Sequence, residues 1–412
     1  MNIAVAQSGG PTCAINASLL GVIKEALKYT EIKTVYGSVN GIEGIINDRL
    51  VDIKSVIRTN EDMELLRQTP STVLGSCRFK LPEFEKDPVI YKTILNRFNS
   101  YGIKAFFYIG GNDSMDTVEK LSRYFLSVNS DIKIIGIPKT IDNDLCETDH
   151  TPGFGSAAKY VATSLQEITR DSSVYSVRSI TVVEIMGRHA GWLAASAAVL
   201  HANGESAPHL VYLPECKFSL EKFYADIEKQ IPLHKAIIIV VSEGIDIDGF
   251  SLDARSKNVD AFGHEYLSGV GKFLERKISK RYGCKVRSIE LNVMQRCASH
   301  ISSRTDIEES ETIGSAAVKE AMINGATGKI MCFKRILDMP YTVRIEPEDA
   351  CKIANKEKFF PLEWLNTEQN NISDDALKYF LPLIEGEQII RMKNGIPVHY
   401  KVGDILDKYI KA

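Results

Sequence analysis

Short apolar runs alternate along the first 250 residues with loops that are rich in glycine or charge and with stretches of helical spacing. After the first run and its two glycines, isoleucine or leucine recurs every four residues from position 15 to position 27, as on one face of a helix. Strands that alternate with helices indicate βαβ units and a mostly parallel sheet. We predict strands at residues 3–6, 105–109, 132–137, 179–185, 209–213 and 236–241, and helices from about 114 and over about 155–169.

The pattern changes after residue 245. Residues 246–261 are polar and predict a loop, residues 262–282 predict a charged helix, and residues 288–293 predict another strand. Thr305 and Glu308 have the spacing of a capping box, so a helix is expected to open there. Residues 341–412 are expected to form a C-terminal extension that is peripheral from about residue 370.

Composition and charge narrow the class of protein. The 412 residues suffice for two or three domains, and a net charge of only -3 gives no chain-wide attraction to nucleic acid or an anionic membrane. No run approaches the length of a membrane span, and the N-terminal apolar run is too short for a signal peptide. The eight cysteines show neither C-x-x-C spacing nor clustering with histidine, which argues against a zinc site or a disulfide framework. We therefore expect a cytoplasmic protein whose anion sites are local.

The loop after the 132–137 strand carries three charges, on Lys139, Asp142 and Asp144. In extended backbone, residues two apart share a face, so one carboxylate can act as a base while the other tunes it or helps to hold a cation. Lys139 adds a mobile positive charge beside them. The alternative is a solvated polar loop that only caps a strand.

Two other loops combine glycines with the end of a strand and the start of a helix. In Ser8-Gly9-Gly10, missing side chains let backbone N–H groups approach a phosphate at a helix N-terminus. The loop 110–114, Gly-Gly-Asn-Asp-Ser, repeats this arrangement and adds a carboxylate that can serve Mg²⁺ in phosphoryl transfer. A tight turn in the first loop and an Asx turn in the second remain alternative explanations.

Four arginines stand in or beside loops of this kind. Arg78 and Arg188 lie among small residues, and Arg287 and Arg296 flank the predicted strand at 288–293. The planar guanidinium matches phosphate better than the point charge of lysine does. A lone surface arginine is more often solvated or ion-paired, so this reading stays open for each of them.

A glutamate and two histidines complete the set of candidates. Glu243 follows the apolar run 236–241, where its carboxylate can accept sugar hydroxyls or cap the next helix. His189 and His300 have no metal-like partners in the sequence, and we expect both to be satisfied or exposed.

Taken in order from residue 3 to about residue 335, these motifs resemble the phosphofructokinase family. The most specific parts are PKTIDND at 138–144, GGND at 110–113 and MGR at 186–188. The resemblance implies an α/β fold with two lobes, mostly parallel sheets flanked by helices, and an active site in the cleft between the lobes. It also implies that Asp142 is the base for the C1 hydroxyl of the sugar and that Asp144 supports it.

The resemblance assigns further residues to two substrates. The positions that bind fructose 6-phosphate in the family correspond to Thr140, Ile141, Asp142, Met186, Gly187, Arg188, Glu243, Arg287, Val293 and Arg296. Of these, Arg287 matches an arginine that a neighbouring subunit often supplies. The positions on the phosphoryl-donor side correspond to Gly9, Gly10, Arg78 and the 110–114 loop, including Gly111.

Two residues indicate the donor. ATP-using members resemble GGDGS and PGTIDND, with glycine where this sequence has Asp113 and Lys139. Charged side chains there fill room that the α-phosphate of a nucleotide needs, and the ammonium can neutralise a pyrophosphate leaving group. QSGGPT at 7–12 and QRCASH at 295–300 are also similar to the pyrophosphate-dependent branch.

Three positions depart from the family pattern. Asn112 stands where relatives usually have an aspartate associated with Mg²⁺; it keeps an oxygen but loses the charge, and it is our candidate metal ligand. An arginine expected near Ser179 is missing, with Arg178 adjacent. Val293 replaces a histidine of ATP-using relatives, so its contact would be apolar or through the backbone.

From the resemblance we expect reversible, Mg²⁺-assisted transfer of a phosphoryl group from diphosphate to fructose 6-phosphate. Residues 1–150 with about 297–340 are expected to form the donor lobe, and residues 151–296 the sugar-phosphate lobe, in a homodimer or larger homo-oligomer. The alternatives are an ATP-dependent kinase, a kinase that prefers sedoheptulose 7-phosphate, and a non-catalytic regulatory subunit of the same fold. Asn112 favours the last alternative, whereas Asp142 and Lys139 speak against it.

Overall fold

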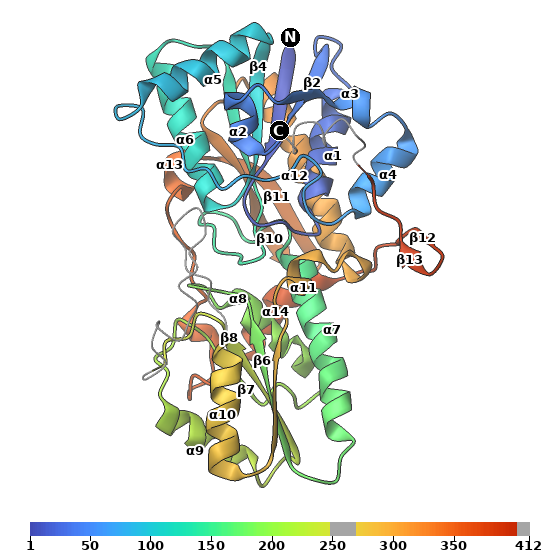
Figure 1. Cartoon of the computed structure of the whole chain (residues 1–412), viewed down its shortest axis with the longest axis vertical. Coiled ribbons are helices and arrows are strands. Elements are labelled where there is room, and N and C mark those ends of the chain that lie inside the picture. Colours follow the sequence, from blue (N-terminus) through green and yellow to red (C-terminus); the bar gives the residue numbers. More distant parts are fainter. Residues whose placement is uncertain (248–268, 402–412) are drawn as a thin grey trace.

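Two sheets with helices on both faces form two lobes, one above the other in Figure 1. The computed structural model describes residues 1–247 and 269–401. The larger sheet has seven strands in the order β11 (Tyr341–Asp349), β10 (Lys329–Asp338), β5 (Lys133–Pro138), β4 (Ile103–Gly110), β1 (Asn2–Gln7), β2 (Thr34–Ser38) and β3 (Leu50–Asp52). The smaller sheet has four strands in the order β7 (Leu210–Tyr212), β8 (Ala236–Ser242), β6 (Ser179–Ile185) and β9 (Lys285–Glu290). The strands predicted up to residue 241 are confirmed to within two residues at each end.

The parallel pairing of the larger sheet brings three loops to one edge. Gln7 at the end of β1 lies opposite Ile109, and Gly110 at the end of β4 lies opposite Pro138 at the end of β5. Because these strands end together, the two glycine loops and the charged loop after β5 lie side by side, where ligands of parallel sheets bind. The edge pairs of this sheet, β2 with β3 and β10 with β11, are antiparallel.

The smaller sheet places a second set of loops opposite the first. β6 lies between β8 and β9, all parallel, with Ile185 opposite Ser242. The residues that follow, Met186–Arg188 after β6 and Glu243 after β8, therefore leave adjacent strands at the same edge. In Figure 1 this edge faces the upper lobe.

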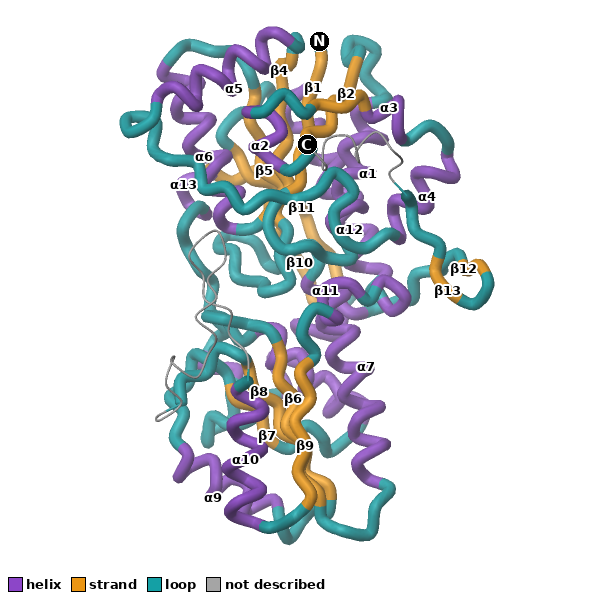
Figure 2. The backbone as a smooth tube through the Cα atoms, viewed as in Figure 1, coloured by secondary structure: helices purple, strands orange, loops and turns teal. Residues whose placement is uncertain are grey.

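Helices cover both faces of each sheet, as the purple segments of Figure 2 show. On the larger sheet, α1 and α12 pack together on one face, and α5 and α6 cover the other. On the smaller sheet, α7 and α8 lie on one face, and α9 and α10 on the other. The α-helices are α1 (Ile15–Ala26), α2 (Gly41–Ile46), α3 (Ile53–Val56), α4 (Asn60–Gln68), α5 (Pro88–Ser100), α6 (Asn112–Ser127), α7 (Phe154–Ser173), α8 (Trp192–Ala195), α9 (Leu220–Gln230), α10 (Val270–Tyr282), α11 (Met294–Cys297), α12 (Arg304–Ile323), α13 (Ala350–Ile353) and α14 (Asp374–Phe380). The shorter elements are the 3₁₀ helices η1 (Ser196–Asn203), η2 (Ser299–Ile301), η3 (Leu362–Trp364) and η4 (Leu381–Ile384), and a hairpin of β12 (Met392–Lys393) and β13 (Ile396–Pro397).

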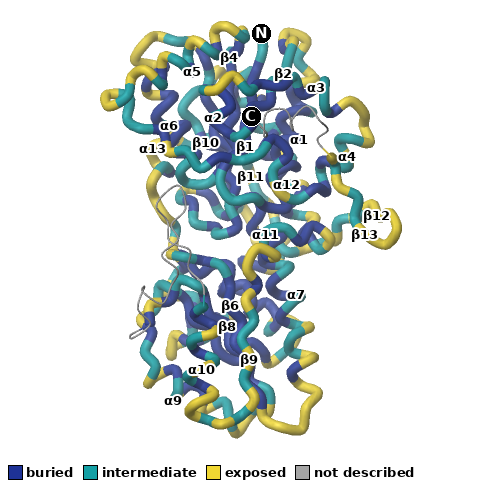
Figure 3. The backbone as a smooth tube through the Cα atoms, in the orientation of Figure 1, coloured by how far each residue is buried: buried dark blue, intermediate teal, exposed yellow. Residues whose placement is uncertain are grey.

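The C-terminal segment is part of the fold rather than peripheral. β11 is the edge strand of the larger sheet, and Phe360, Phe380 and Leu383 are buried in the core of the smaller-sheet lobe. Dark blue in Figure 3 marks buried residues, which run through both lobes. The expectation of a peripheral tail is therefore wrong for residues 371–384, because scattered apolar side chains reach the core without forming a regular stripe. The domain boundaries stay a prediction.

The helix predicted to open near residue 305 is confirmed as α12, but the capping box predicted for its start is wrong. The N-cap of α12 is Ser303, whose Oγ accepts a hydrogen bond from Asp306 N (3.3 Å), and Thr305 lies inside the helix. The Asp306 carboxylate accepts hydrogen bonds from Gly153 N (2.8 Å) and Ser156 N (3.0 Å) at the start of α7. A negative charge at a helix N-terminus is stabilised by the helix dipole. Asp306 therefore joins α12 to the start of α7.

Two other predictions between residues 246 and 293 need comment. The strand predicted at 288–293 is β9, but it covers Lys285–Glu290 and ends before Val293. The predicted charged helix is confirmed from Val270 as α10. Its first part, residues 262–268, and most of the predicted loop at 246–261 lie outside the described residues.

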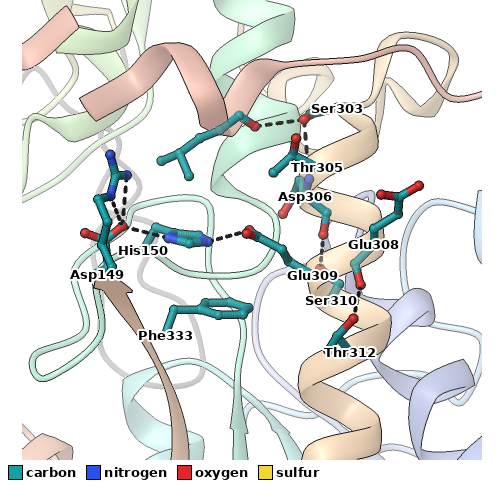
Figure 4. A network of polar contacts seen from close by, with 12 residues as sticks. Asp149, His150, Ser303, Thr305, Asp306, Glu308, Glu309, Ser310, Thr312 and Phe333 are labelled. Carbon is teal, nitrogen blue, oxygen red and sulfur yellow. Dashed lines mark hydrogen bonds and ion pairs between the residues drawn. The ribbon is translucent and has the colours of Figure 1, made fainter. Parts of the chain in front are cut away.

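A buried histidine in the segment between β5 and α7 contacts both α12 and β10 (Figure 4). His150 Nδ1 lies 2.9 Å from Asp149 Oδ2, and His150 Nε2 lies 2.7 Å from Glu309 Oε2 on α12. The imidazole also stacks on Phe333 of β10, with ring centroids 4.4 Å apart. Burial alone would lower the pKa of His150, but Glu309 and Asp149 raise it to about 9. The ring is therefore a cation held between two carboxylates at neutral pH.

We expect the stability of the protein to depend on this cation. A histidine with a raised folded-state pKa contributes stability that is complete below about pH 6.5 and is lost as pH rises through about 9. His150→Gln should lower the free energy of unfolding by about 3–5 kcal/mol near pH 6.5, as for other broken buried pairs. The measurement is the melting temperature from pH 6.5 to 9.5. His300→Gln, at an exposed position, is the control; a difference between wild type and His150→Gln that does not shrink with rising pH would refute the assignment.

Candidate active site

A cavity of about 630 Å³ lies where the carboxyl ends of the two sheets face each other. This volume suits small-molecule ligands. Its lining residues come from both lobes and from a late segment of the chain, and they are Ser8, Gly9, Gly10, Pro11, Arg78, Gly111, Asn112, Asp113, Ser114, Lys139, Thr140, Ile141, Asp142, Asp144, Met186, Arg188, His189, Ala190, Glu243, Arg296, Asn355, Glu357 and Phe359.

At the upper end of the cavity, a glycine turn meets a buried lysine. Gly9 has a φ of 75°, a conformation that favours glycine, and its carbonyl accepts a hydrogen bond from Ser76 Oγ (2.7 Å). Lys139 Nζ donates to Gly10 O (2.5 Å), and a Cβ on Gly9 would lie only 3.2 Å from Nζ. The side chain of Lys139 is almost completely buried. The turn and the lysine side chain thus form one compact wall of the cavity.

The second glycine loop opens α6 beside that wall. Gly111 is the N-cap of this helix, and Asp113 lies in its first turn. Lys80 Nζ is 4.0 Å from Asp113 Oδ1, a distance at which an exposed pair contributes little. A helix N-terminus with small residues in front of it suits an anion such as a phosphate. Both predicted phosphate loops therefore reach the cavity together.

The side chain of Asn112, our candidate metal ligand, is engaged with the late segment of the chain. Its Oδ1 accepts a hydrogen bond from Asn355 N (2.7 Å), and its Nδ2 donates to Lys356 O (2.7 Å). An aspartate could accept the first of these bonds but could not donate the second. Only one lone pair of Oδ1 is left for a cation, so the metal role of Asn112 stays a prediction.

The charged loop after β5 is held in a turn. Asp142 N donates to Thr140 Oγ1 (3.1 Å), and Asn143 adopts a left-handed φ of 55°. The extended backbone that we assumed for Asp142 to Asp144 is therefore wrong. Both carboxylates nevertheless line the cavity, since the turn directs each of them there.

Burial shifts the pKa values of these charged groups toward neutrality. It lowers the pKa of Lys139 to about 7, against the opposing effect of Asp142 and Asp144. Burial, reinforced by the charge of Asp142, raises the pKa of Asp144 to about 7, and burial also raises the pKa of Asp142. A carboxylate with a raised pKa is a stronger base, and such shifts are common at catalytic sites.

The smaller-sheet lobe supplies the lower wall. Met186 and Arg188 line it from the loop after β6, and Glu243 lines it from the end of β8. Gly187 N donates to Glu243 Oε1 (3.4 Å), which links the two loops. Burial, with a contribution from Asp142, raises the pKa of Glu243 to about 7. This wall offers a guanidinium for an anion and a carboxyl group for hydroxyls.

Most of the predicted site residues are brought together, and three are not among the lining residues. Gly187 lies next to the cavity, between Met186 and Arg188. Arg287 is ion-paired with Asp171 (2.9 Å) on the smaller-sheet lobe. Val293 is the N-cap of α11 and is about half exposed. The predicted contact of Val293 therefore finds no support at this cavity. The role of Arg287, which the resemblance assigns to a neighbouring subunit's site, stays a prediction.

Five lining residues were not assigned to the site from the sequence, namely His189, Ala190, Asn355, Glu357 and Phe359. His189 Nδ1 lies 2.9 Å from Glu357 Oε1, so its expected description as satisfied or exposed holds while it also borders the cavity. Asn355, Glu357 and Phe359 come from the segment after α13. These residues belong to no motif or periodic pattern, and they reach the site only because the chain passes between the lobes there.

The arrangement suits phosphoryl transfer between two anionic ligands. Glycine turns, a helix N-terminus, Arg78 and Lys139 supply donors for phosphate oxygens, and Asp142 lines the same cavity as Arg188 and Glu243 of the lower wall. Among residues 1–247 and 269–401, no group of three or more His, Cys, Asp or Glu side chains could hold a metal ion by itself. All eight cysteines are free thiols. In the same two ranges, the helices lack the combination of length and apolar character that crossing a bilayer requires.

Comparison with known proteins agrees with this geometry. A family model described as phosphofructokinase matches residues 2–320. The pyrophosphate–fructose 6-phosphate 1-phosphotransferase of Halomonas elongata is 38% identical over 399 residues, which are 96% of this chain and 94% of the relative. The enzyme of the same name from Xanthomonas campestris pv. campestris is 38% identical over 408 residues, 98% of this chain and 96% of the relative.

The fold has a similar counterpart among solved structures. The crystal structure of a pyrophosphate-dependent phosphofructokinase from Marinobacter aquaeolei superposes with a TM-score of 0.86 and 34% sequence identity. The match covers 98% of this chain and 96% of that one. The likeness therefore includes the C-terminal segment, which lies beyond the range of the family model.

Proposed function

The chain belongs to the phosphofructokinase family, and we propose that it transfers a phosphoryl group from pyrophosphate to fructose 6-phosphate. The products are fructose 1,6-bisphosphate and phosphate. The names of its relatives in Halomonas elongata and Xanthomonas campestris support this activity, as does the structure from Marinobacter aquaeolei. Under this proposal the larger-sheet lobe binds the donor and the smaller-sheet lobe binds the sugar phosphate.

The observation that carries the choice of donor is the position of Lys139. Its ammonium lies against the Gly9-Gly10 turn, 2.5 Å from Gly10 O, and its side chain is buried. A small inorganic donor can use this charge, whereas the α-phosphate and ribose of a nucleotide would need the space that the side chain fills. Asp113 narrows the same end of the cavity.

The proposed mechanism gives each of these side chains a role in proton transfer, charge stabilisation or substrate orientation. Asp142 takes the proton of the C1 hydroxyl as that oxygen attacks the phosphorus, and the raised pKa of Asp142 makes it a better base. Lys139 and Arg78 stabilise charge on the transferring and leaving phosphoryl groups. Arg188, Glu243 and Arg296 orient the sugar phosphate from the other side. Catalysis in this scheme is positioning combined with electrostatic stabilisation.

A divalent metal belongs to this proposal. Phosphofructokinases are phosphoryl transferases that generally need one, and we propose Mg²⁺. The residues present fit an ion that takes one oxygen from Asn112 and one from the Asp113 carboxylate, with the remaining ligands coming from donor phosphates and water. When bound, Mg²⁺ would neutralise charge on the phosphate oxygens of the donor and so assist the departure of the leaving phosphate.

Two finer points belong to the same proposal. The free thiols fit a reducing compartment, and we place the protein in the cytoplasm. Arg287 is partly exposed on the smaller-sheet lobe, away from its own cavity, where it can reach a neighbouring subunit. We therefore propose a homodimer or larger homo-oligomer.

A comparison of donors tests the function. With fructose 6-phosphate and Mg²⁺ present, we expect turnover with pyrophosphate to exceed turnover with ATP by at least about 10²-fold in kcat/KM, the effect of one misplaced charge at the donor. Because pyrophosphate and the bisphosphate product are close in transfer potential, fructose 1,6-bisphosphate and phosphate should yield pyrophosphate. Brisk use of ATP with no use of pyrophosphate would reject the donor assignment. Sedoheptulose 7-phosphate, the acceptor of the alternative kinase, is assayed in place of fructose 6-phosphate as the control.

A further inference from the structure

A segment that lies beyond the residues matched by the phosphofructokinase family model lines the cavity of the candidate active site. Residues 355–360, here called the strap, follow α13 and descend from the upper lobe to the lower lobe (Figure 1). Asn355, Glu357 and Phe359 line the cavity, and Phe360 is buried in the core of the smaller-sheet lobe. The strap therefore touches both lobes and the space between them.

Its first attachment is to the donor loop. Asn112 exchanges two hydrogen bonds with the strap backbone, one from Asn355 N and one to Lys356 O, both 2.7 Å. Asn355 Nδ2 also donates to Asp116 Oδ1 (2.7 Å), one turn further along α6. The start of α6 is thus hydrogen-bonded to the strap through both Asn112 and Asp116.

The second attachment is to the loop that carries the proposed base. Lys358 N donates to Asp144 O (2.7 Å), so strap and loop are joined through their backbones. Lys358 Nζ donates to Thr148 O (3.0 Å) and Asp149 O (2.8 Å), and it lies 3.4 Å from Asn143 Oδ1. An ammonium has three donors, and here all three point at residues 143–149.

The third attachment is to the smaller-sheet lobe. Trp192 Nε1 donates to Lys358 O (2.9 Å), and Lys358 Nζ lies 4.9 Å from the centroid of the Trp192 ring. Phe360 N donates to Glu215 Oε1 (2.8 Å). Lys358 therefore lies where the base loop, the strap and the lower lobe meet, and its ammonium contacts both the base loop and Trp192.

We propose that Lys358 is a positioning residue for phosphoryl transfer, which holds the turn containing Asp142 and Asp144 in its reactive arrangement across the lobe junction. This inference rests on the proposed function for its reaction. Lys358 does not line the cavity, so it acts through the loop and not on the substrates. Its charge also favours the ionised form of Asp144, whose pKa burial raises.

The test compares Lys358→Met with Lys356→Met. Methionine keeps the length of the side chain beside Trp192 but removes the charge and the three donors. Lys356 lies two residues away on the strap and is exposed, so its substitution removes the same charge without changing bonds to the base loop. Lys358→Gln, which keeps one polar group, is a second variant in case methionine impairs folding.

Two readouts are needed besides stability. A purely structural role for Lys358 would lower the melting temperature without both lowering kcat and speeding hydrogen exchange at residues 141–149. The first is kcat and KM with whichever donor the wild type uses; a displaced reactive group costs about 10²-fold in kcat, and we expect KM for both substrates to change by less than about threefold, as for an interaction made in the transition state. The second is amide hydrogen exchange of peptides covering residues 141–149. We expect faster exchange there in Lys358→Met and no change in Lys356→Met.

Each outcome decides the matter. Unchanged kcat in folded Lys358→Met, or equal losses in Lys356→Met, would overturn the proposal even if the melting temperature falls. Should the wild type use ATP alone, the donor assignment fails while the kcat comparison still tests Lys358. Should it use neither donor, the proposed function fails, and unchanged exchange at 141–149 would then reject the positioning role independently.

Discussion

Asp142→Asn is expected to lower kcat for the forward reaction by about 10² to 10⁴-fold, with KM for both substrates nearly unchanged. The amide keeps the size of the side chain and can still accept the 3.4 Å hydrogen bond of Thr140 Oγ1, so the turn should persist. What is lost is the ability to accept a proton from the attacking hydroxyl. Steady-state kinetics with pyrophosphate and fructose 6-phosphate in both directions measure the effect.

Asp144→Asn is the matched control for that substitution. Asp144 lies on the same turn and its pKa is also raised, but under our mechanism it supports the base and does not accept the proton. Its loss should therefore cost at least about tenfold less than the loss of Asp142, because removing a neighbouring negative charge alters the base without abolishing it. A larger loss for Asp144→Asn than for Asp142→Asn would show that the two roles are reversed.

The double variant Lys139→Gly with Asp113→Gly should lose pyrophosphate use and improve in relative use of ATP. Removing one preorganised charge at the donor costs about 10² to 10³-fold in kcat. In addition, the two glycines vacate the space around the Gly9-Gly10 turn that the buried lysine now fills. The measurement is kcat/KM for each donor at saturating fructose 6-phosphate.

Lys139→Met separates the effect of the lysine charge from the effect of the space that the lysine side chain fills. Methionine fills most of the same volume but has no ammonium to bond to Gly10 O. We expect it to lose pyrophosphate use as the double variant does, without any gain with ATP. If ATP use rose equally in both variants, steric exclusion of the nucleotide would be the wrong explanation for donor choice.

The alternation of apolar runs with helical spacing predicts the parallel strands well, because the pattern is local. The six strands that were predicted up to residue 241, which are β1, β4, β5, β6, β7 and β8, are short runs buried almost throughout, and such runs can be recognised without knowing their partners. The strands β2 and β3 at one edge of the larger sheet were not predicted, and β2 is only partly buried. The predictions that failed concern contacts. Ser303 rather than Thr305 caps α12, since Ser303 Oγ accepts the hydrogen bond of Asp306 N. The Asp306 carboxylate bonds to the start of the distant α7, and the residues near 306 in the sequence do not indicate that partner.

The site shows the same difference between features predicted from local sequence and features that depend on distant contacts. Gly9, Gly111, Lys139 and Asp142 each follow a strand, so parallel pairing with matched ends was enough to predict that they meet. Arg287 and Val293 were inferred from position in a motif alone, and the structure places both away from the cavity of this chain. The strap, with Asn355, Glu357 and Phe359, could not be anticipated, since its approach depends on where α13 ends and Phe360 is buried.

By itself, then, the order of residues determined the strands, the loops at their ends and the charges that those loops carry, because each depends on neighbours a few positions apart. Only the tertiary structure decided that Asn112 bonds to the strap, that Lys358 holds the turn of Asp142 and Asp144, and that His150 is a buried cation. These depend on side chains brought together from more than 100 residues away, and burial gives their charges an effect that spacing along the chain does not encode.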